Sequence, residues 1–449
     1  MTVGIQPLVD EVNTNVAGAL TTLEQLQLAS VMQDFDQGFT KCVANCAALP
    51  AAADNKGRWI FLQDVCSYRW SDGTAWSRDF ASIEQNIAFS FGCNADNQLG
   101  DRTTTNRSSP VSVLGDVLYW CQVSAGNGFN IGVRSDMTAW GWGCNAGGEL
   151  GDCTSVNRII PRPVVGGFGD WCQVSAGANH SIGVRQNGTA WAWGLGSCGQ
   201  LGDGTSVSKS SPVLVVGGFT DWCQVSAGQH FILGVRQNGT AWGWGCGSGG
   251  RLGNETTVNK CSPVSVVGGF SDWCQVSAGT AHSLGVRQNG TAWAWGCNTC
   301  GPLGDGTTVA KSSPVSVVGG FTDWCQVSAG ANHSLGVRQN GTAWGWGAGA
   351  DGRIGNGTIV SVSSPVSVVG GFTDWCQVSA GLGHSLGVRQ NGTAWAWGQG
   401  STGRLGDGTV VNKSSPVSIA GGLTGWRCVS IYTNGNHSLA VRSDSTKGF

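Results

Sequence analysis

The stretch "VRQNGTAWAWG", residues 184–194, decides the fold because it returns at a fixed step along the chain. It reappears as "VRQNGTAWGWG" from Val235 and as "VRQNGTAWAWG" from Val286, each time 51 residues further on. Asn187-Gly188 separates two stretches of alternating residues, which predicts a β-hairpin with a type I′ turn. Asn-Gly-Thr is also an N-glycosylation pattern, but the geometry of the turn already accounts for it.

Two ladders of aromatic residues keep the same 51-residue step. The first consists of Trp120, Trp171, Trp222, Trp273, Trp324, Trp375 and Trp426. The second opens an aromatic-x-aromatic-Gly pattern at Phe89, Trp140, Trp191, Trp242, Trp293, Trp344 and Trp395, with Phe91, Trp142, Trp193, Trp244, Trp295, Trp346 and Trp397 as the second aromatic. These ladders hold 19 of the 22 tryptophans, so tryptophan serves mainly to build the repeat.

Each repeat contains four short segments that alternate like β-strands, joined by Gly-rich turns. Units of four strands repeated around an axis form a β-propeller. The last repeat ends in "HSLAVRSDSTKGF", before its third strand, and "NIAFSFG", residues 86–92, supplies that strand from the other end. We therefore predict an all-β fold: a seven-bladed β-propeller closed by N- and C-terminal strands, which removes free sheet edges.

The stretch "VSAGANHSLGVRQNGTAWGWGAGADGRIGNGT", which starts at Val327, resembles the repeat of the regulator-of-chromosome-condensation family, a seven-bladed propeller. The resemblance covers about 80% of the chain and implies the fold more strongly than a function. The family's namesake exchanges nucleotide on a small GTPase through an inserted wedge and binds chromatin through a basic tail, and both are absent from this sequence. A plant photoreceptor of this fold repeats Gly-Trp-Arg-His-Thr, which Gly425-Trp426-Arg427 matches only in part. A β-lactamase-inhibiting propeller is a pure protein binder, the mode that we favour.

Three parts are expected: a helical oligomerisation or attachment segment over 1–48, a small β-meander over 49–83, and the propeller over 84–449. Apolar residues with helical 3-4 spacing indicate a short coiled coil, or an amphipathic helix that packs on its own chain: Ile5, Val9, Val12, Val16, Ala19, Leu23 and Leu26. The stretch "YRWSDGTAW" from Tyr68 resembles hairpins of bacteriophage tail and head appendage proteins. This layout implies a virion location and a homotrimer.

Composition excludes several classes of function. Charged residues make up 12% of the chain, the net charge is −2 and no basic block is present, which argues against nucleic acid as a partner. No apolar run reaches the roughly 18 residues of a membrane helix, so no membrane insertion is expected. The start "MTVGIQPLVDEVN" has no signal-peptide pattern, and the 18 cysteines are therefore expected to be free thiols.

No catalytic, metal or cofactor site stands out from the repeat, so we predict that the protein is not an enzyme. Four of the six histidines share one register, which indicates a structural position that bonds a neighbouring turn: His180, His282, His333 and His384. His230 and His437 are displaced from it. The cysteines after the first Trp ladder also share a position and are interpreted as small apolar fillers. Cys297 and Cys300 form a lone C-x-x-C, which makes zinc improbable. The Gly-Asp-Gly-Thr loops lack the acidic density of a calcium site.

Comparison of the repeats with one another suggests a binding face. The residues after Trp-Gly and those after Ser-Ala-Gly vary, whereas the Asn-Gly hairpins and the links between blades hardly change. In an up-and-down blade the two variable loops share one face of the disc. Neutral drift and packing constraints explain part of this contrast. The predicted ligand-binding residues are Asn94, Asp96, Asn97, Asn145, Glu149, Gln200, Gln229, His230, Arg251, Asn298, Asp351, Arg353 and Arg404.

The sequence thus predicts a bacteriophage virion appendage, similar to a tail fibre, whose propeller binds a receptor on the host surface. Its residues 1–83 would contact other virion proteins. Two alternatives stay open: a structural decoration or connector that binds another virion protein, and a cellular propeller for protein–protein interaction.

Overall fold

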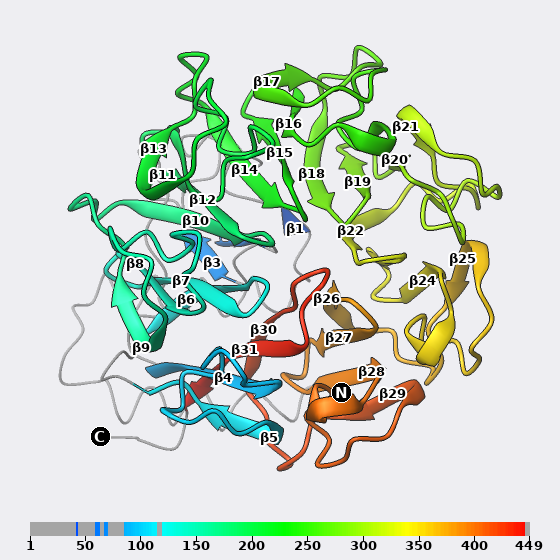
Figure 1. Cartoon of the computed structure of the whole chain (residues 1–449). Helices are drawn as coiled ribbons and strands as arrows, with labels where there is room; N and C mark the ends of the chain where they lie inside the picture. Colours follow the sequence, from blue (N-terminus) through cyan, green and yellow to red (C-terminus); the bar gives the residue numbers. More distant parts are fainter. Residues whose placement is uncertain (1–41, 44–58, 63–66, 71–84, 115–118, 445–449) are drawn as a thin grey trace, which may run out of the picture.

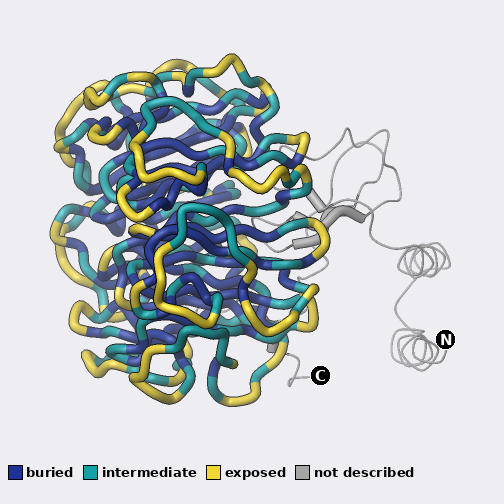
Figure 2. Tube along the Cα trace, turned by 90° about the vertical axis from the view of Figure 1, so that its right-hand side faces the viewer, coloured by how far each residue is buried: buried dark blue, intermediate teal, exposed yellow. Residues whose placement is uncertain are grey.

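The computed structural model describes residues 42–43, 59–62, 67–70, 85–114 and 119–444. Within these ranges, seven four-stranded antiparallel sheets are arranged as blades around a central axis (Figure 1). The predicted all-β, seven-bladed propeller is therefore confirmed. The buried stretches of the chain run through the inside of the disc, and the exposed ones lie at its surface (Figure 2).

Blades 1 to 6 each use four consecutive strands. Blade 1 contains β6 (Trp120–Ala125), β7 (Phe129–Arg134), β8 (Ala139–Gly143) and β9 (Arg158–Pro163); blade 2 contains β10 (Trp171–Ala176), β11 (His180–Arg185), β12 (Ala190–Gly194) and β13 (Lys209–Leu214); blade 3 contains β14 (Trp222–Ala227), β15 (Phe231–Arg236), β16 (Ala241–Gly245) and β17 (Lys260–Ser265). Blade 4 contains β18 (Trp273–Ala278), β19 (His282–Arg287), β20 (Ala292–Gly296) and β21 (Lys311–Ser316); blade 5 contains β22 (Trp324–Ala329), β23 (His333–Arg338), β24 (Ala343–Gly347) and β25 (Val362–Ser367); blade 6 contains β26 (Trp375–Ala380), β27 (His384–Arg389), β28 (Ala394–Gly398) and β29 (Lys413–Ser418).

Blade 7 closes the ring from both ends of the repeat region, as predicted. It contains β30 (Trp426–Ser430), β31 (His437–Asp444), β4 (Gln85–Gly92) and β5 (Arg107–Ser112) in that order. The pairing of β31 with β4 is continuous from His437 opposite Gly92 to Asp444 opposite Gln85. Hydrogen bonds between strands far apart in the sequence therefore hold the ring closed.

A separate three-stranded sheet precedes the propeller in the sequence. In it, β1 (Cys42–Val43) pairs in parallel with β2 (Trp59–Leu62), and β2 pairs antiparallel with β3 (Ser67–Trp70). The segment 49–83, for which a small β-meander is expected, contains the hairpin of β2 and β3 in the described residues, and a strand from the segment 1–48 pairs with it. The predicted helix falls largely on residues 1–41, outside the described residues, and remains a prediction. The described residues contain no α-helix, only short 3₁₀ turns: η4 (Ser248–Gly250), η5 (Ala350–Gly352) and η6 (Ser401–Gly403).

The hairpin that opened the sequence argument has a different turn from the predicted one. Gly188 has φ 72°, but Asn187 is not among the residues with positive φ, whereas a type I′ turn needs both. The Gly188 amide donates to the Arg185 carbonyl at 2.9 Å, which indicates a type I turn followed by a left-handed glycine. Asn187 instead uses its side-chain oxygen to accept bonds from the amide and the hydroxyl of Thr189. The type I′ prediction was therefore wrong, although the hairpin itself is confirmed.

The two Trp ladders pack neighbouring blades together. Trp193 is completely buried, and its ring centroid lies 5.7 Å from that of Trp171. Its indole Nε1 donates to the Glu149 carbonyl of blade 1 at 2.8 Å, so the bond crosses from one blade to the next. Trp191 contacts Phe168 in the link between the blades, with ring centroids 4.9 Å apart. These tryptophans are therefore scaffold rather than a binding site.

The inner strands are joined by side chains around the central axis. Gln224 of β14 accepts from the Val276 amide and donates to the Val276 carbonyl of the next blade, both at 2.8 Å. Ser226 accepts from the Ala278 amide at 3.0 Å. The serine bond recurs at every junction, including the one that closes the ring. The equivalent glutamines and serines line a central cavity of about 180 Å³. The side-chain oxygen of each glutamine accepts a hydrogen bond from a valine amide of the next blade.

Candidate functional site

The two kinds of variable loop share one face of the disc, as the sequence predicts. Arg251, in the loop between the third and fourth strands of blade 3, donates from Nη1 to the carbonyl of Thr280 at 2.9 Å. Thr280 lies in the loop between the first and second strands of blade 4, so the two loop types are in direct contact. We call this surface, formed by both loop types of all seven blades, the variable face.

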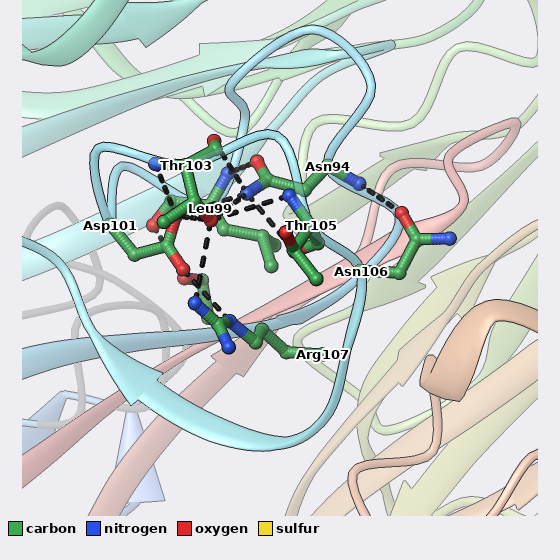
Figure 3. A network of polar contacts seen from close by, with 8 residues as sticks. Asn94, Leu99, Asp101, Thr103, Thr105, Asn106 and Arg107 are labelled. Carbon is green, nitrogen blue, oxygen red and sulfur yellow. Dashed lines mark hydrogen bonds and ion pairs between the residues drawn. The ribbon is translucent and has the colours of Figure 1, made fainter.

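The predicted site residue Asn94 lies at the centre of its own loop (Figure 3). Its side chain is completely buried. Its Nδ2 donates to Asp101 Oδ1 at 3.0 Å and to the Thr103 carbonyl at 2.8 Å, and its Oδ1 accepts from the Leu99 amide at 2.9 Å. Asp101 in turn forms a 2.9 Å ion pair with Arg107. Burial alone would raise the pKa of Asp101, but hydrogen bonds from Thr103 and Arg107 outweigh it and lower that pKa.

Asn145 and Asn298 repeat this arrangement in blades 1 and 4. Each is completely buried and donates from Nδ2 to a carboxylate seven residues further on, at 3.0 Å. A buried amide with all of these partners fixes the loop backbone. All three asparagines were predicted to contact a ligand. Their side chains have no free surface in this structure, so we assign them to the loop framework.

Glu149 in blade 1 and Gln200 in blade 2 stand at positions equivalent to each other, 51 residues apart, and are also buried. Glu149 accepts from the Gly147 amide at 2.8 Å and from Asn179 Nδ2 at 3.3 Å. Burial raises the pKa of this carboxyl group. Gln200 accepts from the Cys198 amide at 2.8 Å. These two side chains therefore support the loops from inside instead of presenting charge or amide groups to a ligand.

The three predicted arginines act as clamps between loop segments. Arg251 and Arg404 are only 9% and 4% exposed. Arg353 donates to the Leu382 carbonyl of the next blade at 3.0 Å and pairs with Asp351 at 2.9 Å. Arg404 donates to the Ser401 carbonyl and to Gln399 Oε1, both at 2.9 Å. Arg353 is thus paired with a carboxylate, and the guanidinium groups of Arg251 and Arg404 donate to carbonyl oxygens within the variable face.

The other predicted residues keep free surface. Asp96 is exposed, and Asn97, Gln229, His230 and Asp351 are half-buried. Sequence reasoning missed several small polar side chains that are exposed on this face: Asn127, Ser197, Ser248, Thr299, Asn332 and Asn436. They stand in the same variable loops, so comparison of the repeats could have found them. A ligand-binding role for any residue of this face stays a prediction.

The opposite face is uniform for a structural reason. Arg185 forms a 2.7 Å ion pair with Asp170 in the link that precedes its blade, and its guanidinium lies 4.1 Å from the ring centroid of Phe168. The same arrangement recurs in blades 3 to 6. The hairpins therefore cannot change without disturbing the links between blades. Packing therefore accounts for the uniformity of this face, and the difference between the two faces is not by itself evidence of ligand binding.

Five of the six histidines are buried in the interior. His282 Nε2 lies 3.0 Å from Ser334 Oγ of the next blade, and Ser334 donates its own proton to the Pro302 carbonyl at 2.7 Å. The histidine must therefore donate, so Nε2 carries the proton. His333 and His384 bond equivalent serines, and His437 bonds Asn130. These histidines are thus structural, as predicted, but they bond serine or asparagine side chains rather than a turn.

The buried histidines predict acid sensitivity that one substitution can reduce. Burial lowers the pKa of His282 to about 3, whereas an unfolded histidine titrates near about 6.5. Between these values the unfolded chain binds a proton that the folded chain does not, so stability falls as pH falls, by about 1.4 kcal/mol per pH unit for each such group. His282→Phe should remove the contribution of one histidine to this loss of stability, about 2 kcal/mol between pH 6.5 and 5. The variant should fold, because Phe231 already fills this position in blade 3.

Urea unfolding of the wild type and of His282→Phe at several pH values measures this difference. The pH dependences of the two proteins should coincide between pH 7 and 8, where the histidine is neutral in both states. Parallel curves down to pH 5 would mean that His282 does not titrate as inferred.

In the described part of the chain, no group of three or more His, Cys, Asp or Glu side chains could hold a metal ion. Among the same residues, no helix has the length and apolar character needed to cross a membrane. The inner-strand cysteines contact backbone; the Cys223 thiol, for example, donates to the Val235 carbonyl at 3.1 Å.

Comparison with known proteins agrees with this geometry. Ultraviolet-B receptor UVR8 of Arabidopsis thaliana is 29% identical over 353 residues, which cover 76% of this chain and 80% of that protein. The mitochondrial RCC1 domain-containing protein RUG3 of the same plant is 26% identical and covers 68% of this chain and 75% of its own length. The human E3 ubiquitin-protein ligase HERC2 is 26% identical over 326 residues, but this chain spans only 6% of that protein.

Solved structures show the same fold. Prp20p from Saccharomyces cerevisiae superimposes with a TM-score of 0.72 at 21% identity, covering 81% of this chain and 93% of that chain. Human WBSCR16 superimposes with a TM-score of 0.71 at 20% identity, covering 80% and 99%. The family model of the RCC1-like domain matches residues 87–440, from β4 to β31, and so includes every blade. The chain therefore belongs to the RCC1-like domain family.

Proposed function

We propose that this chain is a non-catalytic propeller for protein–protein interaction and that its variable face binds the partner. The observation that carries the proposal is the construction of that face: buried asparagines and arginines hold the loops, while the exposed tips differ from blade to blade. Loops that are ordered before binding lose little conformational entropy when a partner docks. Membership of the RCC1-like family supports the same mode.

The chemistry of the exposed residues indicates what partner would fit. The outer parts of the variable loops expose Ile359 and Val360 in blade 5 and Val410 and Val411 in blade 6, each between 58% and 69% exposed. Blades 5 and 6 are neighbours, and Asp351 of blade 5 contacts Asn412 of blade 6 at 2.9 Å. Aliphatic side chains beside small neutral ones suit a folded protein with a weakly charged, partly apolar surface. They suit nucleic acid poorly.

The narrower hypothesis of a phage appendage is a special case of this proposal. None of the relatives named above is described as a phage protein, and the homotrimer and the virion location stay predictions. The yeast protein Prp20p is described by its binding to Gsp1p and histones and by its complex with Kap60. A protein partner is thus the more general proposal, and a host receptor or a second virion protein would each be one form of it.

Site-specific photo-crosslinking tests the proposal. A photoreactive amino acid is placed at Ser197, Ser248 or Thr299 on the variable face of the full chain, and the protein is exposed to an extract of its source cells. We expect these positions to crosslink one and the same protein, which is then purified and its binding measured. The arginine clamps are left intact, because truncating them would disturb the loops themselves.

Matched control positions lie on the opposite face. Gln186, Gln237 and Gln288 are exposed there, in hairpins of the same blades as the three probes or of their neighbours. They should give no crosslink to that protein. A double variant, Ile359→Ser with Val410→Ser, should weaken binding of the purified partner. Crosslinks confined to the opposite face, or binding unaffected by the double variant, would contradict the proposed orientation and surface.

A further inference from the structure

Two cysteines from neighbouring blades meet on the variable face. Cys198 lies in the loop between β12 and β13 of blade 2, and Cys246 follows β16 of blade 3. Both are half-buried, and the Cys246 side chain is close enough to the Cys198 thiol to affect its pKa. The backbone holds each residue in place: the Cys198 amide donates to Gln200 Oε1 and the Cys246 amide to the His230 carbonyl, both at 2.8 Å.

The equivalent positions one blade further on show how closely these loops approach. Gly249 and Cys297 lie 51 residues after Cys198 and Cys246, and a Cβ built on Gly249 would be 3.8 Å from Cys297 Cβ. Disulfides have a Cβ–Cβ distance of about 3.8 Å. Gly249 has a left-handed φ that Cys198 does not share, so this distance shows how near the loops of blades 3 and 4 come and is not the Cβ–Cβ distance of Cys198 and Cys246.

This chain places cysteine at both positions only once. The equivalent pairs in the other blades are Asp96 with Cys144, Gly147 with Leu195, Gly249 with Cys297, Cys300 with Ala348, Asp351 with Gln399 and Thr402 with Cys93. We infer that Cys198 and Cys246 are a modification site at which a reversible disulfide links blades 2 and 3. This inference does not depend on the proposed function, because it concerns only the two thiols.

A low-molecular-weight disulfide such as oxidised glutathione supplies the oxidising equivalents. One protein thiolate attacks it, forms a mixed disulfide and releases one glutathione. The second protein thiol loses its proton to solvent and displaces the second glutathione, so two electrons leave the protein for the oxidant. Burial raises the pKa of the Cys198 thiol and Cys246 adds to the effect, whereas the charge of Arg251 opposes it. The exchange is therefore expected to be faster at mildly alkaline pH.

Tryptic mapping of the folded, full-length protein tests this directly. After incubation with oxidised glutathione, free thiols are alkylated and the chain is digested. Cys198 then lies alone in peptide 186–209 and Cys246 alone in peptide 237–251, so a linked pair of these peptides identifies the bond. We expect this to be the main linked pair and to disappear on addition of a reductant.

The controls use single substitutions and an internal reference. Cys198→Ser and Cys246→Ser should each abolish the linked pair, and circular dichroism checks that both variants stay folded. Cys223, alone in peptide 210–236, should remain alkylated as a free thiol. Linkage of Cys198 to Cys261 in peptide 261–287 instead, or complete alkylation of Cys198 and Cys246 after oxidation, would overturn the inference.

Discussion

Removal of residues 437–449 is expected to abolish cooperative folding of the propeller. The deletion takes away β31, which pairs with β30 on one side and with β4 on the other. Leu439, Ala440 and Val441 of this strand are at most 1% exposed, so their burial is lost as well. Each large aliphatic side chain contributes about 1.5–3 kcal/mol. Since domains are stable by only about 5–15 kcal/mol, we expect no single thermal transition.

A shorter deletion provides the control. Removal of residues 445–449 spares β31 and should leave the thermal unfolding curve unchanged. Circular dichroism and calorimetry of the two truncated proteins show whether loss of β31, and not of the last five residues, removes the thermal transition. If the longer deletion unfolded at the same temperature as the wild type, blade 7 would not be what closes the ring.

Gly290→Ala, in the hairpin turn of blade 4, is expected to destabilise the protein strongly. Gly290 has φ 74°, and a Cβ there would overlap with the carbonyl oxygen of Thr322 in the link to blade 5. The Gly290 carbonyl also accepts from the Trp324 amide at 2.9 Å, so the link cannot move away freely. The left-handed backbone costs about 1–2 kcal/mol with alanine, and the overlap about 1–3 kcal/mol more.

Gly269→Ala separates these two costs. Gly269 has a similar φ of 67°, but nothing lies within 4 Å of its Cβ position. We therefore expect Gly269→Ala to lower the free energy of unfolding by only about 1–2 kcal/mol, the cost of the left-handed backbone alone. Chemical unfolding of both variants gives the comparison. Equal losses would show that the contact between hairpin and link is not tight.

The two faces of the disc thus have different physical bases. On the uniform face, hairpin, link and arginine pack into one repeated unit, so sequence identity between blades follows from packing. On the variable face, the packing lies beneath the surface, in Asn94 and its counterparts, and the tips above it are free to differ. Oxidation of Cys198 and Cys246 would join two of these loops directly.

The sequence alone determined the fold because the repeat is periodic at every level. The 51-residue step, the aromatic ladders and the alternation within each strand are local patterns, and the missing third strand of the last repeat could be counted directly. The turn type was the exception: Asn-Gly supports both a type I′ turn and a type I turn with a left-handed glycine. The folded chain has the second, with Gly188 next to the Thr220 carbonyl in the link to the next blade.

The tertiary structure alone decided which residues of the candidate site are free. Asn94, Asn145 and Arg404 are polar and stand in variable loops, so the sequence predicted that they contact a ligand. In the structure their hydrogen bonds are satisfied within the loops and water is excluded from them. Polarity in a sequence does not distinguish a side chain that faces solvent from one that holds a loop from inside. That distinction depends on which carbonyls and carboxylates the folded loop brings around the side chain.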